Sequence, residues 1–114
     1  MRGKSLLLLL VLAGCSRGPE ADLQYIKQAR SVGAEWALVN EQANQGKLTG
    51  TYVRSMREWL RSDLQTTASS LTQPDSRYGE EIRTLLAQPD DAEPDELRAH
   101  VAVLELIEAR LESA

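Results

Sequence analysis

Apolar residues recur at steps of three and four along most of the chain after residue 20, which is the spacing of one face of an α-helix. From Glu20 to Asn44, one such stripe consists of Tyr25, Ala29, Val32, Trp36, Val39 and Ala43. Gly46 is well placed to end this helix in a left-handed conformation. Gly33 lies beside the stripe. We interpret it as a tolerated glycine, with a bend or a close helix crossing as the alternative.

Three further helices follow from the same pattern. The second is expected from Thr49 or Thr51 to Thr72, because either threonine can accept a hydrogen bond as N-cap. Its apolar face consists of Val53, Met56, Leu60, Leu64, Ala68 and Leu71. The third is short, about Ser76–Gln88, and lies between two prolines. The fourth opens at Pro94, carries acids in its first turn and runs nearly to the C-terminus.

These elements predict an all-α fold, a small antiparallel bundle of three to four helices. The link between the first two helices is short, so they should be antiparallel neighbours. No segment shows the alternation of a strand. The helical domain is expected to span residues 21–114.

The N-terminus has a different pattern. Arg2 and Lys4 precede a short apolar run, and small residues then lead to Cys15, the only cysteine of the chain. This order is typical of a secretory signal. The apolar run is much shorter than the ~20 residues that a membrane-spanning helix needs. The tetrad Leu12-Ala13-Gly14-Cys15 resembles the lipobox of bacterial lipoproteins.

The resemblance implies cleavage between Gly14 and Cys15, removal of residues 1–14 and attachment of lipid to Cys15. Residues 15–20 then form the lipidated cysteine and a short linker. Two or three acyl chains anchor a protein stably in a membrane. The alternative is an ordinary secretory signal, which would leave Cys15 free or in an intermolecular disulfide.

The resemblance also bears on location. In many Gram-negative bacteria, Asp directly after the lipidated cysteine retains a lipoprotein in the inner membrane. Ser16 stands at that position here, which favours the outer membrane, facing the periplasm. In a Gram-positive host the same chain would lie on the outer face of the single membrane.

Charge limits the class of partner. The full chain has 13 cations and 17 acids, a formal net charge of −4. Loss of Arg2 and Lys4 with the signal leaves 11 cations against the same 17 acids, which is −6. This balance argues against nucleic acid as a partner and against a body lying flat on anionic lipid.

The chain offers little catalytic chemistry. His100 is the only histidine, so neither a catalytic triad nor a multi-histidine metal site can form. We expect it at the margin of the core, bonded to a carboxylate or a carbonyl. The acids from Asp90 to Glu96 are interrupted by a proline and lack the glycine of a calcium loop. We interpret them as loop and cap residues, and expect no metal site and no enzyme activity.

Two surface features remain. Arg54, Arg57 and Arg61 share one strip of the second helix at i, i+3 and i+7. We interpret this strip as a solvated face, partly paired with Glu58 or with Glu105, Glu108 and Glu112 of the last helix. The alternative is a contact with a partner or with lipid head groups. Leu106 points away from the main apolar face of the last helix, either as a second contact surface or as an ordinary exposed leucine.

Together these features predict a membrane-anchored envelope lipoprotein that binds another envelope protein near the membrane. It would be a non-enzymatic accessory factor, an adaptor or pilotin-like, although the similarity to helical pilotins is one of architecture alone. The alternatives are a structural envelope protein and a helical lipoprotein that binds a small ligand. No cofactor is expected beyond the covalent lipid on Cys15.

Overall fold

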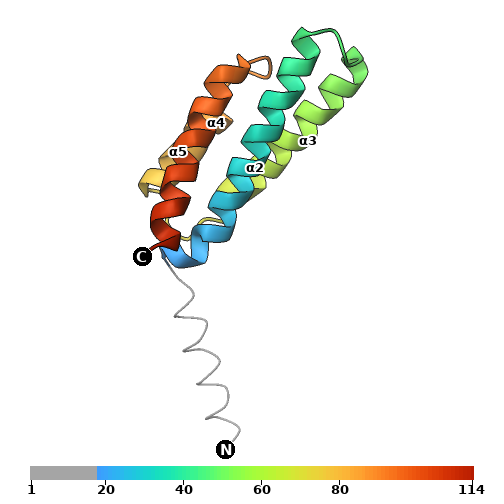
Figure 1. The fold of residues 1–114 in the computed structure, drawn as a ribbon. Helices are drawn as coiled ribbons and strands as arrows, with labels where there is room; N and C mark the ends of the chain where they lie inside the picture. Colours follow the sequence, from blue (N-terminus) through green and yellow to red (C-terminus); the bar gives the residue numbers. More distant parts are fainter. Residues whose placement is uncertain (1–17) are drawn as a thin grey trace, which may run out of the picture.

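The longest element, α2 (Pro19–Asn44), forms the centre of the structure, a computed structural model that describes residues 18–114. It is followed by α3 (Gly50–Ser69), α4 (Arg77–Leu86) and α5 (Pro94–Glu112). The described part of the chain is all-helical, and consecutive helices run in opposite directions as a small bundle (Figure 1). The predicted fold class is thus confirmed.

The helix ends follow local signals in the sequence. Thr49 is the N-cap of α3 and accepts a hydrogen bond from the Tyr52 N–H at 3.2 Å, whereas Ser76 caps α4 in the same way. Gly46 follows α2 with a φ of 69°, the left-handed conformation expected of it. Of the two threonines considered for the start of the second helix, Thr49 is therefore the one used.

Two predicted boundaries are wrong. The structure ends α3 at Ser69, not Thr72, because the N–H groups of Thr72 and Gln73 donate to the Asp22 carboxylate at 2.8 and 3.1 Å instead of continuing the helix. The third helix is also shorter than predicted: α4 ends at Leu86.

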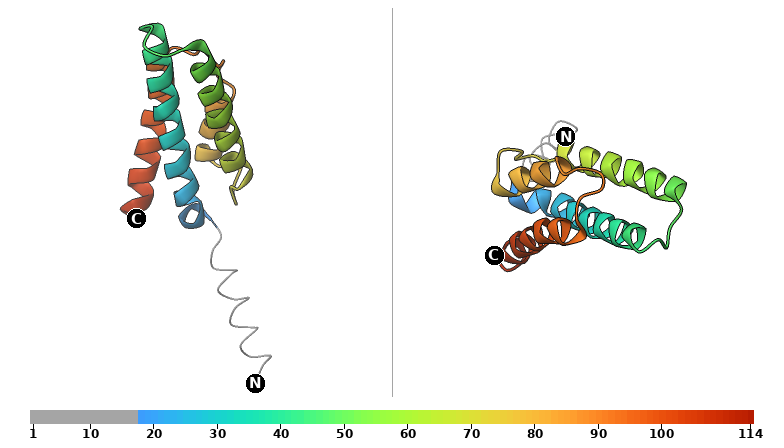
Figure 2. Two further views of the ribbon diagram at one scale, coloured as in Figure 1. Left: turned by 90° about the vertical axis from the view of Figure 1, so that its right-hand side faces the viewer. Right: turned by 90° about the horizontal axis from the view of Figure 1, so that it is seen from above.

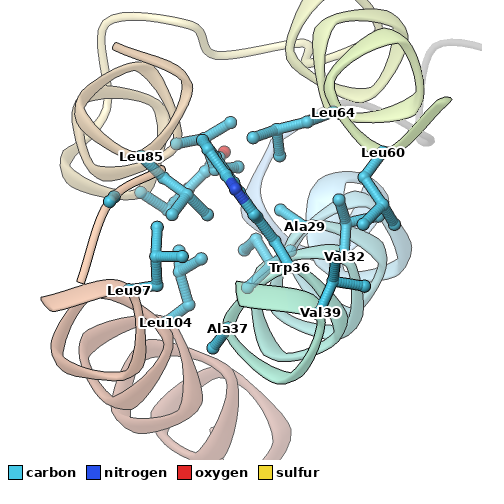
Figure 3. Packing of buried hydrophobic residues seen from close by; sticks show 14 of the residues in the cluster. Ala29, Val32, Trp36, Ala37, Val39, Leu60, Leu64, Leu85, Leu97 and Leu104 are labelled. Carbon is cyan, nitrogen blue, oxygen red and sulfur yellow. The ribbon is translucent and has the colours of Figure 1, made fainter. Parts of the chain in front are cut away.

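The core surrounds α2 on two sides. This helix packs against α5 and α3, and α4 closes the bundle between those two (Figure 2). Trp36 of α2 lies at the middle of the core, with Leu64 of α3, Leu85 of α4 and Leu97 of α5 around it (Figure 3). Because α2 has neighbours on both sides, its buried face is wider than the predicted stripe and includes Ile26 and Ala37.

The role expected of Gly33 is corrected. A Cβ at this position would lie 2.8 Å from Val101 Cγ2 and 3.0 Å from Leu85 Cδ2. Both distances are shorter than a normal contact, so the glycine lets α2 approach α4 and α5 closely. It is a crossing point between helices and not a merely tolerated residue.

A buried carboxylate ties the lower end of the bundle together. Asp22 is fully buried, and besides the two N–H groups after α3 it accepts a hydrogen bond from the Tyr78 hydroxyl at 2.6 Å. Burial alone would raise the pKa of Asp22, but these hydrogen bonds outweigh it and hold the pKa below its ordinary value. Asp22 therefore stays ionised and joins the start of α2 to the α3–α4 loop and to α4.

The same contact predicts how stability changes at high pH. Burial and the bond to Asp22 raise the pKa of Tyr78 from 10.0 to about 12. A group with a raised folded pKa stabilises the fold below its unfolded pKa and loses this contribution as the pH rises through the folded pKa. Between pH 10 and pH 12 the loss should reach about 2–3 kcal/mol of the free energy of unfolding.

Chemical denaturation at a series of alkaline pH values measures this loss. Tyr78→Phe should remove most of the decrease, whereas Tyr52→Phe, at an exposed tyrosine, should leave it as in the unmodified chain. An unchanged slope in Tyr78→Phe would contradict the assignment.

Candidate functional site

A loop closes the core beside the C-terminal half of α2. It is needed because α4 has only 10 residues, whereas α2 has 26. We call residues 87–93 the closing loop. Its backbone carbonyls are satisfied from α2: the Trp36 Nε1–H donates to the Asp90 carbonyl at 3.0 Å, and the Asn40 amide donates to Asp90 and Ala92 at 3.0 and 2.8 Å. Asn40 is only 1% exposed, and its bond to Ala92 is buried, whereas the two bonds to Asp90 are partly buried.

Arg61 holds the closing loop from the α3 side. Its guanidinium donates to the carbonyls of Leu86 and Gln88 at 2.7 and 2.8 Å, and pairs with the Asp90 carboxylate at 2.8 Å. It also lies over the Trp36 ring, 5.1 Å from the ring centroid, within the range of a cation–π interaction.

The three arginines of the predicted strip are therefore in different environments. Arg61 is committed to the loop. Arg57 is half-buried and donates from Nε to Asn40 Oδ1 at 3.0 Å. Arg54 is exposed, and its side chain has no hydrogen bond or ion pair with any residue of the range 18–114. Within residues 18–114, the whole guanidinium of Arg54 and the two Nη groups of Arg57 therefore have no hydrogen-bond partner.

The acids of the last helix are not partners of this strip. Glu108 pairs with Arg30 at 2.6 Å and Glu112 with Lys27 at 3.1 Å, both on α2. The reason is the topology, in which α2 separates α3 from α5.

Arg54 and Arg57 line a pocket at the end of the bundle where α2 ends and α3 begins. The pocket has a volume of about 470 Å³ and opens to solvent. We call it the distal pocket. It is lined by Ala43, Leu48, Gly50, Val53, Arg54, Arg57, Glu58 and Asp90. Apolar side chains, two guanidinium groups and two carboxylates therefore line the same pocket.

His100 and Asp95 have structural partners. His100 is partly buried, and its Nδ1 lies 2.7 Å from Glu81 Oε1, the carboxylate contact expected of it at the core margin. Asp95 pairs with Arg98 in the first turn of α5 at 3.3 Å. Among the residues described, no group of three or more histidine, cysteine or acidic side chains is arranged to hold a metal ion.

The proposed lipidation site lies outside the described residues, as do the cleavage position Gly14–Cys15 and the signal segment 1–14. Helix α2 begins at Pro19, so only three residues separate it from Cys15. Gly18 is already fixed to the bundle, since its N–H donates to Thr72 Oγ1 at 3.2 Å. From residue 18 onward, no helix has both the length and the apolar character to cross a bilayer.

Comparison with known proteins adds no relative: no family model, curated protein or solved structure matches this chain.

The unequal roles of the arginines predict unequal effects on stability. Arg61→Ala removes the donors for the carbonyls of Leu86 and Gln88 and should lower the free energy of unfolding by about 1–3 kcal/mol. Arg54→Ala touches no such contact and should stay within about 0.5 kcal/mol of the unmodified chain. Urea denaturation of both variants measures the difference. Equal stabilities would show that Arg61 does not hold the loop.

Proposed function

We propose that the chain is a lipid-anchored protein of the bacterial envelope whose distal pocket binds a segment of another envelope protein. It acts as a non-enzymatic accessory factor. In a Gram-negative cell it lies on the outer membrane and faces the periplasm, in keeping with Ser16 after the lipidated cysteine.

The anchor rests on the lipobox resemblance and on chain length. Four backbone steps from Cys15 to Pro19 span at most about 14 Å when extended. The lower end of the bundle, where Asp22 joins α2 to the α3–α4 loop, is thereby kept close to the lipid. The acyl chains supply the membrane affinity, and the acidic body adds none.

The observation that carries the proposal is the position of the distal pocket relative to this anchor. Helix α2 has 26 residues, which at 1.5 Å per residue is about 39 Å. The pocket is lined by Ala43, near the end of α2, whereas Pro19 begins this helix. The two ends of α2 lie at opposite ends of the bundle (Figure 1). A bundle standing on its anchor would present the pocket to the envelope space and away from the lipid.

The lining of the pocket indicates the chemistry of the partner. Arg54 has no hydrogen bond or ion pair within residues 18–114, and of the two acids that line the pocket, Glu58 and Asp90, Asp90 is already paired with Arg61. Ala43, Leu48 and Val53 are the apolar side chains of the lining. We therefore propose a peptide segment that carries a carboxylate next to a small apolar side chain, since a guanidinium binds a carboxylate in a bidentate manner.

The anchor is tested by Cys15→Ala. This variant should move from the membrane fraction to the soluble fraction, because the thiol that accepts the lipid is gone, whereas Ser16→Ala should remain with the membrane. Fractionation of cells followed by immunoblotting measures the distribution. A Cys15→Ala chain that stays fully with the membrane would contradict the anchor.

The pocket is tested by a crosslinking pull-down from native membranes, with the captured proteins identified by mass spectrometry. Arg54→Glu should lose a co-purifying envelope protein, because the guanidinium that binds its carboxylate is replaced by an acid. Arg77→Glu is the matched control: it makes the same change of charge at the exposed start of α4, far from the pocket. A partner retained by Arg54→Glu, or lost from both variants, would contradict the assignment to the pocket.

A further inference from the structure

Helix α5 has a second apolar face that its own bundle does not cover. The inner side of the helix packs against α2 and α4 (Figure 2). On the outer side, Ala99, Ala102, Leu106 and Ala109 are all exposed, and Leu106 is 60% exposed. The solvent side of a bundle helix usually carries charged residues, so this face is unusual.

The spacing of this face matches the seam of a coiled coil. Positions 99, 102, 106 and 109 are separated by three, four and three residues, the a and d positions of a heptad. The alanines allow a second helix to approach closely, and Leu106 is the one large side chain. We call these four residues the α5 outer face.

Charged residues flank the α5 outer face, and they differ in what they contact. Arg98 pairs with Glu41 at 3.1 Å, so it is committed to α2. Glu105 and Arg110 are exposed, and their side chains have no hydrogen bond or ion pair with any residue from 18 to 114. In heptad terms Glu105 is a g position and Arg110 is the following e position. In a parallel coiled coil, a g residue pairs with the e residue five positions further along the other helix.

We propose that two copies of this chain pair side by side through the α5 outer face, with the helices parallel. Leu106 then packs against Leu106 of the second copy at the seam. Glu105 of each copy pairs with Arg110 of the other, which gives two equivalent ion pairs about a two-fold axis. These are the two flanking charges that the described fold leaves free, and parallel pairing uses both.

The direction of pairing agrees with the membrane anchor, which is part of the function proposed above. Parallel helices place both Cys15 anchors at the same end of the dimer, so both can enter one leaflet. An antiparallel pair would place the anchors at opposite ends and would separate Glu105 from Arg110. A single helix pair is a small interface, so pairing should be weak in solution and stronger when a shared leaflet raises the local concentration.

The test is disulfide crosslinking of the full chain in native membranes. Leu106→Cys should form a dimer on mild oxidation, seen as a doubled mass on a non-reducing gel, because identical residues face each other at the seam. Leu38→Cys, at the exposed side of α2, should stay monomeric, and the chain with no added cysteine reports any disulfide at Cys15. Absence of a Leu106→Cys dimer, or equal dimer from Leu38→Cys, overturns the proposal.

Charge reversal tests the parallel register in the Leu106→Cys background. Arg110→Glu should lower the crosslinked fraction about fivefold, because two ion pairs become repulsive. Adding Glu105→Arg to it should restore the fraction, since the pairs are rebuilt with opposite polarity. If Glu105→Arg does not restore the crosslinked fraction, the parallel register is wrong. Membrane fractionation of the same samples reports the anchor separately, so a chain that dimerises away from the membrane contradicts the anchor and leaves the pairing standing.

Discussion

The structure depends on how the bundle closes the gap left by its short third helix. Helix α4 covers α2 over only part of its length, and beyond it the closing loop contacts α2 through Trp36 and Asn40. Ala92 is the one buried residue of this loop. The loop carbonyls that face the bundle need donors, because unpaired backbone polar groups are costly inside a protein. Trp36 and Asn40 from α2 and Arg61 from α3 supply these donors. The loop is thereby held between the two longest helices.

Two of the three arginines in the strip on α3 help to hold the closing loop, and the third is available to bind another molecule. Arg61 satisfies the Gln88 carbonyl of the loop, and Arg57 orients the Asn40 side chain, whose amide group donates to the loop. Arg54 lines the distal pocket and has no partner within residues 18–114. At the other end of the molecule, Asp22 performs the corresponding task for the α3–α4 loop. Buried polar groups from α2 therefore hold both ends of the bundle together. The proposed function places the anchor at the Asp22 end and the partner at the Asn40 end.

Much of the fold could be predicted from the sequence, because its signals are local. Periodicity places the four helices, and Thr49 and Ser76 cap them where a side-chain oxygen is available. The sequence offered a close helix crossing at Gly33 only as an alternative, because the choice depends on which helices cross α2 at that level. Asn40 follows Trp36 by four residues within the apolar stripe, and a polar residue at such a position is a signal of a buried hydrogen bond. Its partners on the closing loop, about fifty residues away in sequence, come only from the three-dimensional structure.

In the proposed arrangement, the bundle stands on its lipid with the distal pocket away from the membrane. Fluorescence quenching measures this directly in vesicles that contain the lipidated protein and a quencher attached to the lipid headgroup. One probe is placed at Asp75, in the exposed α3–α4 loop, and the other at Gly50, the first residue of α3. Strong quenching is expected at position 75, near the membrane, and little at position 50, at the far end of the bundle. Equal quenching at both positions, or stronger quenching at position 50, would contradict this arrangement.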